Sequence, residues 1–544
     1  MPEQIVEYRR LLDRWTLVIL ITSGIWVAGL ALWGVYLVRN FEGIATIDAL
    51  DIAQEARRLY RGEGLTTGFL KPVAILKQGG NPTPPDLYNS PVYVYLLAFS
   101  FKIFGISEGS ILGSSLFWAF LAGILLFFLV RARHGLFFAS LAFLLYAGNL
   151  GVIEGAFSGL PLSFVSFLLL LLTAAVYYRK PHSLLWTALL GFLTGFLYLA
   201  EFDFLFLSLP VLVIVLDDTP AARWKHALVF LAAFLLCSSP WWIRNARVAG
   251  NPLYSLHWLD FRAYSAPFPG NRIARDFDPA ALARALPFDL FREKLARFLR
   301  LGYRFWFSFS HFLLMPLFLI SIFRPDDDRR RRAITVMVYT LFMGELALIA
   351  AGNGDFGRML AFIPLIVIVG LETGAGLLRS LSLSRLAALL LTVAFCAVCV
   401  YPGVIASVFG LPQQKYLSAV LNKEEAAQIR TNPSLAKMQS LVKADEVVLS
   451  DVPWAVAWYA NRSAVWIPWK IDQMNELKKI FKNLRFLYLT PVLFKYPEVE
   501  NVQDWQSIYR SGMVPEWLQI DRGILLPGDE VIMGDIIFER LELE

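Results

Sequence analysis

A short charged segment holds the residues of this chain that are best suited to chemistry at a surface. It runs from Ile47 to Tyr60 and contains three acids and two arginines. Wound as a helix at about 100° per residue, it presents a charged face opposite a face of alanines. A carboxylate and a guanidinium held in this way can act on a substrate borne by a lipid, whereas a merely solvated helix face is the alternative. The charged face is formed by Asp48, Asp51, Glu55 and Arg58.

Ionisable residues from distant segments are expected on the same side of the membrane. Arg244 follows Pro240-Trp241-Trp242, and Arg358 opens an apolar run. Either guanidinium can grip a phosphate through forked hydrogen bonds that a lysine cannot copy. Ordinary anchoring at the interface is the alternative for each. The acids of this set are Glu154, Glu201 and Asp203 near span ends, and Glu345, which lies inside an apolar run and either acts in the site or bonds a neighbouring helix.

The composition identifies a polytopic α-helical membrane protein. Of its 544 residues, 57% are hydrophobic and only 17% are charged. Soluble domains are nearer to half apolar and a quarter charged. The net charge of +6 is modest, and basic loops account for it. We therefore expect a bilayer as partner and no nucleic acid.

Apolar runs predict about eleven spans. They lie near residues 15–38, 107–130, 135–149, 160–178, 184–200, 204–216, 226–242, 302–323, 333–351, 359–377 and 386–404.

The basic loops assign a side to each end of these spans. Arginine-rich connections follow every second span, among them the run Arg329–Arg332, and they share a side with the N-terminus. Such loops stay in the cytoplasm, so the N-terminus is predicted inside and the C-terminus outside. The outer segments are then 39–106, 150–159, 243–301 and the tail from about 405.

Two further units follow from the pattern. The apolar stretch from Ser90 to Gly105 is too short to span and is predicted to lie in the outer interface. The tail alternates strand and helix patterns, which predicts a soluble α/β domain with a parallel sheet. We expect residues 1–404 to form the transmembrane catalytic domain and residues 405–544 the outer domain.

The sequence gives little support for a metal-binding or nucleotide-binding site. The five histidines are scattered, without an HxxxH or HxH pattern. The tail has no glycine-rich phosphate loop. We predict no dedicated metal site and no firm cofactor, with a divalent cation as an open alternative.

Several motifs together resemble those of the GT-C glycosyltransferases, in particular the aminoarabinose transferase and protein O-mannosyltransferase branches. The resemblance covers most of the chain. The motifs that carry it are Asp48 to Tyr60 with Ala56-Arg57, Ser90-Pro91-Val92-Tyr93-Val94-Tyr95, Pro240-Trp241 with Arg244-Asn245 and Gly250-Asn251-Pro252, Arg358 with Pro364, and Asp451-Val452-Pro453-Trp454 with Trp458 to Arg462.

This resemblance implies an inverting transferase that uses a sugar on a polyprenyl phosphate. The acceptor would be a lipid, a glycan or a protein, and the location the plasma or inner membrane with the site on the periplasmic or extracellular face. Asp48 would take the acceptor's proton, with Asp51 or Glu154 as second acid. Glu154 would alternatively hold a divalent cation. The departing phosphate would be bound by Arg57, Arg58, Arg244 and Arg358.

The sequence departs from the family pattern at two points. Ala49 stands where the second acid of the pair is usual, and Asn89 stands near the position of a lysine that often precedes the Pro-Leu-Tyr segment. The principal alternative function is a transporter or flippase of lipid-linked sugar. It predicts internal repeats and broken helices with mid-membrane charges, and the sequence shows no repeat.

Overall fold

The structure is a computed structural model of the chain. It describes all residues except 1, 42, 45, 73–74, 76–78, 181, 219–221, 255–286, 309–312, 324–328, 353–355, 382, 410–422, 469–470, 496–501, 512–522, 528–534 and 543–544. The predicted outer loop 243–301 therefore lies largely outside the described residues.

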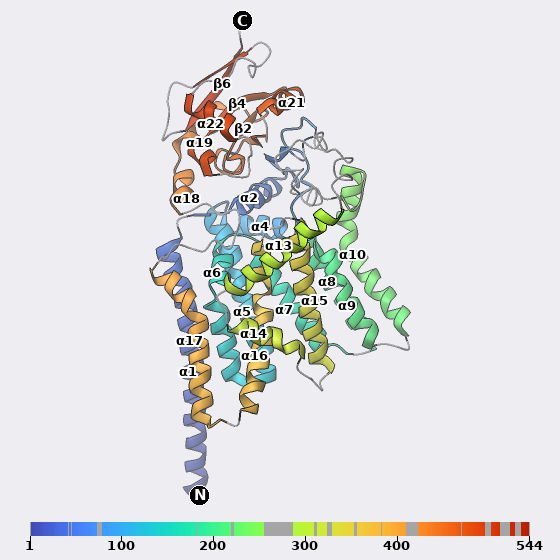
Figure 1. The fold of residues 1–544 in the computed structure, drawn as a ribbon, viewed down its shortest axis with the longest axis vertical. Coiled ribbons are helices and arrows are strands. Elements are labelled where there is room, and N and C mark those ends of the chain that lie inside the picture. The colour runs from blue at the N-terminus through green and yellow to red at the C-terminus, as the bar shows by residue number, and fades with distance from the viewer. Residues whose placement is uncertain are drawn as a thin grey trace.

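A bundle of apolar helices forms the lower part of the molecule in Figure 1. Its helices are rich in Leu, Ile, Val and Phe, and they turn large apolar side chains outward as well as inward, as membrane helices do. They are α1 (Pro2–Asn40), α5 (Glu108–Ala147), α6 (Leu150–Phe157), α7 (Leu162–Tyr178), α8 (Leu184–Ala200), α9 (Phe204–Asp218), α10 (Arg223–Ala249), α14 (Leu314–Ile320), η4 (Ser321–Phe323), α15 (Arg329–Gly352), η5 (Phe356–Phe362), α16 (Ile363–Ser380) and α17 (Arg385–Phe409). Helix α13 (Pro287–Ser308), which carries charged residues such as Arg292, Glu293 and Lys294, packs on α15.

Helix α5 is a hairpin of two antiparallel halves. The backbone leaves helical geometry at Gly135, where φ is 83°, a value that favours glycine. Beyond this point the chain turns back on itself. The contact between the two halves is shown by the Tyr146 hydroxyl, which donates to the Ala119 carbonyl oxygen over 3.2 Å. The two predicted runs 107–130 and 135–149 thus pack against each other, with the arginine-rich connection at their turn.

The number of spans stays a prediction. By length and composition, six helices of the described part are able to cross a membrane, or seven if the α6–α7 pair, bent by 118°, counts as one span. Shorter apolar helices include α8, α9 and the α14–η4 segment. The location of the chain in a membrane, with several passes, is supported by these helices.

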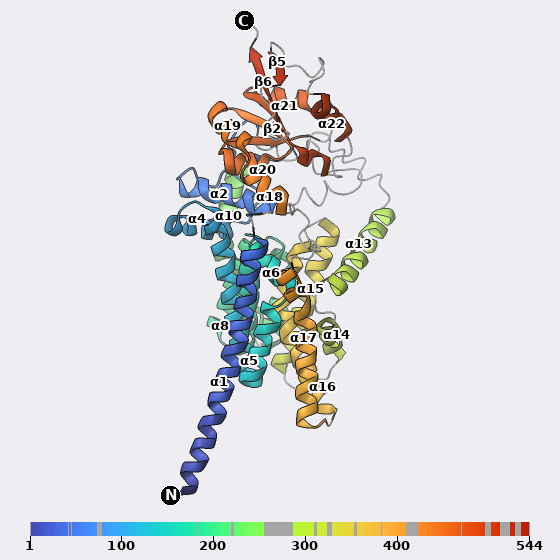
Figure 2. The same ribbon diagram turned by 90° about the vertical axis from the view of Figure 1, so that its left-hand side faces the viewer.

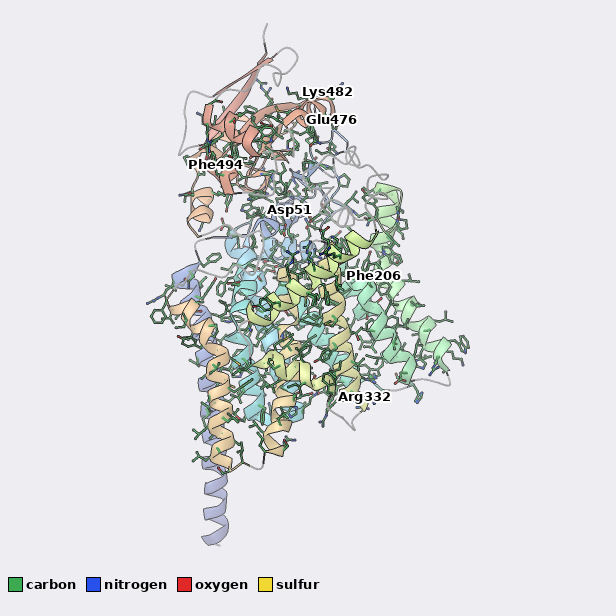
Figure 3. All side chains as sticks on the ribbon, in the orientation of Figure 1. Asp51, Phe206, Arg332, Glu476, Lys482 and Phe494 are labelled. Carbon is green, nitrogen blue, oxygen red and sulfur yellow. The ribbon has the colours of Figure 1, made fainter. Side chains whose placement is uncertain are left out.

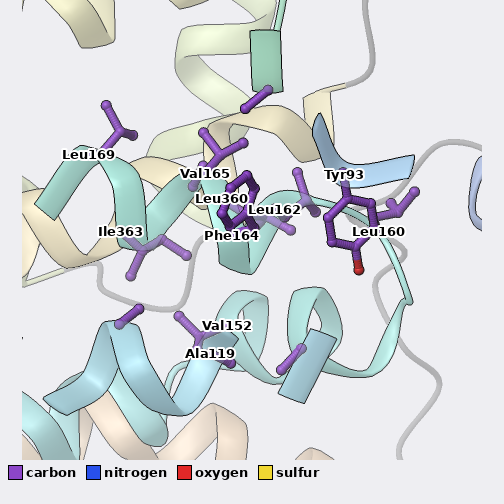
Figure 4. Close-up of a cluster of buried hydrophobic side chains, with 14 of the residues drawn as sticks. Tyr93, Ala119, Val152, Leu160, Leu162, Phe164, Val165, Leu169, Leu360 and Ile363 are labelled. Atoms are coloured by element: carbon purple, nitrogen blue, oxygen red, sulfur yellow. The ribbon is translucent and has the colours of Figure 1, made fainter. Parts of the chain in front are cut away.

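The bundle core joins α5, α6, α7, η5 and α16. Figure 4 shows Leu360 and Ile363 from η5 and α16 among side chains of α6 and α7, with Val152 and Phe164 in the same cluster. A Cβ at Gly151 would collide with the Leu360 side chain, so glycine allows α6 to approach η5 closely. Helix α6 therefore packs against η5, the segment that carries Arg358.

Two helices of the first loop lie between the bundle and the C-terminal domain (Figures 1 and 2). They are α2 (Ile47–Tyr60) and α4 (Pro91–Phe104), and they contact each other. Helix α4 also packs on α5 and α8. The helix predicted from Ser90 to Gly105 is therefore present, and it supports α2 from below.

The C-terminal domain is a six-stranded mixed sheet with the order β1-β3-β2-β4-β6-β5. Strands β2 (Val447–Ser450), β3 (Ser463–Trp466) and β4 (Leu484–Leu489) are parallel, as predicted from the strand–helix alternation. Strands β5 (Gly523–Pro527) and β6 (Ile536–Glu542) run antiparallel. The helices of this region are α18 (Lys423–Arg430), α19 (Pro433–Leu441), α20 (Pro453–Ala455), η6 (Val456–Ala460), η7 (Ile471–Gln473), α21 (Met474–Ile480), η8 (Pro491–Lys495) and α22 (Val502–Ser511).

The first loop supplies the edge strand of this sheet. Strand β1 (Phe69–Leu70) pairs in parallel with β3, with Phe69 opposite Ala464. The Ala464 amide also donates to the Gly68 carbonyl oxygen over 2.8 Å. The outer domain predicted for residues 405–544 thus includes part of the first loop, which ties that loop to the sheet.

Candidate functional site

Helix α2 is held between the bundle and the C-terminal domain. At its start the Thr46 hydroxyl donates to the Ser158 carbonyl oxygen over 2.5 Å. Asp48 is half-buried, whereas Asp51 and Glu55 are only 2% and 1% exposed. The alternative of a solvated helix face is wrong for these two acids, because both side chains are buried. Figure 3 shows Asp51 at the level between the two parts of the molecule.

A lysine and an asparagine bind the buried acids of α2. The Lys71 ammonium lies 3.3 Å from Asp51 Oδ2. Asn89 Nδ2 donates to Asp51 Oδ2 over 3.3 Å and to Glu55 Oε1 over 2.8 Å. Gln54 donates to Asp51 Oδ1 over 3.1 Å. With the adjacent Asp86, these residues form what we call the Lys71 cluster: Lys71, Asp51, Glu55, Asp86 and Asn89.

Asp86 shapes the turn that brings Asn89 to the cluster. Its carboxylate accepts the amides of Tyr88 and Asn89, at 3.1 and 2.9 Å. Burial, and then the charge of Asp51, raise the pKa of Asp86 above its ordinary value. Burial, followed by the charges of Asp86 and Asp51, raises the pKa of Glu55 well above its ordinary value. Burial and the mutual repulsion of these carboxylates thus both favour the protonated forms of Asp86 and Glu55.

A second group of charges lies at the mouth of the bundle. Arg358 Nη1 lies 2.8 Å from Asp203 Oδ2 and 3.2 Å from Glu201 Oε1. Glu345 interacts electrostatically with Asp203, Arg358 and Glu201. We call Arg358, Glu201, Asp203 and Glu345 the Arg358 cluster. The structure therefore brings together Glu201, Asp203, Glu345 and Arg358, which the sequence analysis expected on the same side of the membrane.

Asp48 lies next to this Arg358 cluster. Burial raises the pKa of Glu201 to about 7, against the effect of Arg358 and with the help of the charges of Asp203 and Asp48. Asp48 on α2 and Glu201, which follows α8, are therefore neighbours although they are far apart in sequence. A carboxylate that is half-buried beside other acids is suited to accept a proton.

Tyr88 connects the two clusters. Its ring lies under the Lys71 ammonium, 3.1 Å from the ring centroid. Its hydroxyl also acts electrostatically on Arg358. The Lys71 and Arg358 clusters therefore border one region, between the first loop and the mouth of the bundle.

Two of the predicted phosphate-binding arginines, both on α2, bind groups of the protein itself. The Arg57 guanidinium donates to the carbonyl oxygens of Ala457 and Trp458, over 2.5 and 2.6 Å, and lies over the Trp458 ring. Arg58 pairs with Glu63 at 3.1 Å. Both therefore bind protein groups on the side of α2 that meets η6 and the loop after the helix.

Arg244 closes the other flank of the Lys71 cluster. Its guanidinium donates to the carbonyl oxygens of Asp86 and Leu65, over 2.7 and 3.1 Å, and lies over the Trp241 ring. The predicted arginine is therefore beside the region and holds the loop that contains Asp86.

Glu154 stands on α6, in the wall of the bundle below α2. It is buried, and α6 contacts η5, the segment of Arg358. Among the described residues, no group of three or more His, Cys, Asp or Glu side chains is placed to hold a metal ion. The divalent cation therefore stays an open alternative.

Three residues of the site were not predicted from the sequence to belong to it: Lys71, Asp86 and Asn89. Lys71 directly follows β1, and strand pairing with β3 brings it back over Tyr88. Lys71 therefore lies next to the segment that precedes α4, although no lysine stands immediately before Pro91 in the sequence. The sequence feature that could have indicated Lys71 is the stretch Phe69-Leu70-Lys71-Pro72. Its partner strand lies almost four hundred residues further along the chain.

The overall fold is similar to that of solved membrane glycosyltransferases. ArnT from Cupriavidus metallidurans in the apo state aligns over 97% of this chain and 98% of its own, with 11% identity and a TM-score of 0.56. The same enzyme bound to undecaprenyl phosphate gives a TM-score of 0.52, with the same identity and coverage. The Archaeoglobus fulgidus oligosaccharyltransferase tethered to an acceptor peptide aligns over 96% of this chain and 74% of its own, with 12% identity and a TM-score of 0.57.

These likenesses establish the fold. The chain has the GT-C fold, with a membrane bundle and a C-terminal domain, as the motifs in the sequence predicted. No protein-family model and no curated protein sequence matches this chain significantly.

Proposed function

We propose that this protein is an inverting glycosyltransferase that moves a sugar from a polyprenyl-phosphate donor to an acceptor. One observation carries the proposal: Asp48, on a helix between the bundle and the C-terminal domain, lies beside the Arg358 cluster in a chain with the GT-C fold. Fold alone does not define an activity, so the weight rests on this site.

The proposed partners follow from the similar structures. One of them holds undecaprenyl phosphate and another an acceptor peptide. For this chain we propose a sugar on a polyprenyl phosphate as donor, and a lipid, glycan or protein as acceptor.

Asp48 is the proposed general base. It accepts the proton of the acceptor hydroxyl or amine while that oxygen or nitrogen bonds to the anomeric carbon. The bond from this carbon to the phosphate oxygen breaks at the same time, and the lipid phosphate leaves with the electron pair. Attack opposite the leaving group inverts the anomeric centre. Glu154 is the proposed second acid, in the wall below α2.

The charge of the departing phosphate needs nearby cations. We propose Lys71 and Arg244 for this role, since both border the Lys71 cluster. Arg358 already holds two carboxylates, so its proposed role is to order them. Arg57 and Arg58 act indirectly, by fixing α2 against η6 and the following loop.

The proposed location is the plasma or inner membrane, with the site and the C-terminal domain on the outer face. Arg332, in the basic run at the start of α15, lies toward the end of the bundle remote from the C-terminal domain (Figure 3). Basic loops favour the cytoplasm, which supports this orientation.

The test is transfer by the purified full chain in lipid nanodiscs. Radiolabelled polyprenyl-phosphate sugars of several kinds are incubated with the protein and membrane fractions as acceptors. We expect label to move from one donor to an acceptor, with release of polyprenyl phosphate. Movement of a lipid-linked sugar across the bilayer, without release of sugar from any donor, would contradict the proposal and favour a flippase.

A further inference from the structure

Glu345 is a buried carboxyl that the proposed mechanism does not use. It lies on α15 within the bundle and is only 1% exposed. Both of its carboxyl oxygens are buried and accept no hydrogen bond from the described residues. Buried polar groups almost always have partners, because an unsatisfied one costs about 1–3 kcal/mol. A carboxyl in this position therefore points to a ligand.

The surroundings of Glu345 do not satisfy it. The Arg358 guanidinium is the cation that acts on it, and its Nη1 is already held by Asp203 and Glu201. The other charges that act on Glu345 are these same two acids. Among the described residues, the three carboxyls of the Arg358 cluster thus share one guanidinium, and neither oxygen of Glu345 receives a hydrogen bond.

The position of Glu345 relative to Asp48 identifies the part of the donor that reaches it. Glu201 interacts with Asp48 and also with Glu345. Glu345 therefore lies on the bundle side of the proposed reaction centre. A lipid phosphate is repelled by the surrounding carboxylates, and a prenyl tail has no donors to offer. The sugar ring carries hydroxyl or amino groups that donate hydrogen bonds.

We propose that Glu345 forms a specificity subsite, whose carboxyl accepts a hydrogen bond from one hydroxyl or amino substituent of the sugar being transferred. This inference rests on the proposed function. A site built to bond such a group discriminates against an analogue that lacks it, because a buried carboxyl is then left without a partner.

The experiment compares donors that differ at one substituent. For the donor that the wild type uses, kcat/KM is measured with the parent sugar and with its monodeoxy and deamino analogues. We expect one analogue to be about 10- to 100-fold poorer than the parent. Whether that analogue is deoxy or deamino distinguishes a hydroxyl from an amine.

The variants Glu345→Leu and Glu345→Gln locate this discrimination. We expect Glu345→Leu to lower the parent to the level of the poor analogue, without further loss for that analogue. Glu345→Gln keeps an acceptor oxygen, so we expect it to retain part of the discrimination. The same pattern is expected in equilibrium binding of these donors to protein that also carries Asp48→Asn. The control is Glu372→Gln on α16, whose partner Arg133 lies 2.6 Å away and outside the site.

An equal loss for all donors in both Glu345 variants would overturn the inference, because it would show a role in packing alone. If Glu345→Leu does not fold, the Glu345→Gln ratios decide. Wild-type protein that transfers sugar but does not discriminate among analogues also overturns it, while the proposed function stands. Failure of the wild type to transfer any sugar instead removes the proposed function itself.

Discussion

At the scale of single residues, the candidate site is an acidic region with few cations. Burial raises the pKa values of Glu55, Asp86 and Glu201, and each cluster contains a cation that pairs with its acids. In the proposed mechanism, the general base Asp48 must be ionised to accept a proton. The carboxyls involved are Asp48, Asp51, Glu55, Asp86, Glu201, Asp203 and Glu345.

Lys71 is the cation whose removal we expect to be most informative. Lys71→Met keeps the length of the side chain but leaves Asp51 without its partner at 3.3 Å. We expect kcat/KM to fall about 100-fold, because a positioned charge that offsets the leaving group is lost. Steady-state transfer assays measure this. The control is Lys482→Met, an exposed residue of the C-terminal domain; equal activity of the two variants would refute a role for Lys71.

At the scale of elements, the C-terminal domain acts as the upper support of α2. Strand β1 joins its sheet, and Arg57 binds the carbonyls of η6. The position of Asp48 above the bundle thus depends on a domain that lies more than four hundred residues further along the chain. This coupling accounts for the burial of the Arg57 side chain.

Substitution of Arg57 tests whether the C-terminal domain holds α2 in place. Arg57→Ala leaves two buried carbonyls without donors, at a cost of about 1–3 kcal/mol each. We expect hydrogen exchange in residues 47–60 to become about tenfold faster, and kcat to fall more than KM rises. Arg57→Lys is expected to restore little, since an ammonium cannot form the fork. The control is Arg61→Ala, an exposed neighbour that donates to Asn461 over 3.2 Å; exchange as fast in this variant would argue against a specific tie.

Asp451 is expected to make the stability of the C-terminal domain fall as pH rises. The carboxyl is buried, and it accepts the Thr490 hydroxyl over 2.8 Å. Burial raises the pKa of Asp451 to about 8. The folded state therefore holds a proton that the unfolded state releases near pH 4, so stability is full below that pH and is lost as pH rises through 8.

We expect the unfolding temperature, followed by tryptophan fluorescence of the full chain, to fall between pH 5 and pH 9. The loss corresponds to about 1.4 kcal/mol per pH unit while the proton is held. Asp451→Asn imitates the protonated form, so it should flatten this dependence. Asp445→Asn, at an exposed turn, should leave it unchanged. An identical pH dependence in wild type and Asp451→Asn would exclude this carboxyl as the cause.

At the scale of the whole molecule, the order of helices and strands along the chain could be predicted from the sequence. The contacts within the site could be predicted only in part. Hydropathy predicted a helical membrane bundle, the helical period of the charges predicted α2, and a short apolar run predicted α4. The burial of Asp51 and Glu55 was not predictable, because a helical wheel shows a charged face but not which partner covers it. Lys71 was missed because its position depends on pairing of the two-residue strand β1 with a distant strand.

The orientation of the molecule is open to a labelling test. With the native cysteines replaced, Lys482→Cys should react with a membrane-impermeant maleimide in intact spheroplasts. Arg332→Cys should react only after permeabilisation, because it lies in the basic run at the start of α15. The reverse pattern would place the site on the cytoplasmic face.

The most direct test of the central claim is transfer by Asp48→Asn. This change keeps the shape of the side chain but removes the base, so we predict that sugar transfer from the polyprenyl-phosphate donor is lost. Asp445→Asn serves as the matched control and should transfer as the wild type does. The variant must remain folded in the membrane, with wild-type donor binding. Turnover like that of the wild type in Asp48→Asn would contradict the account.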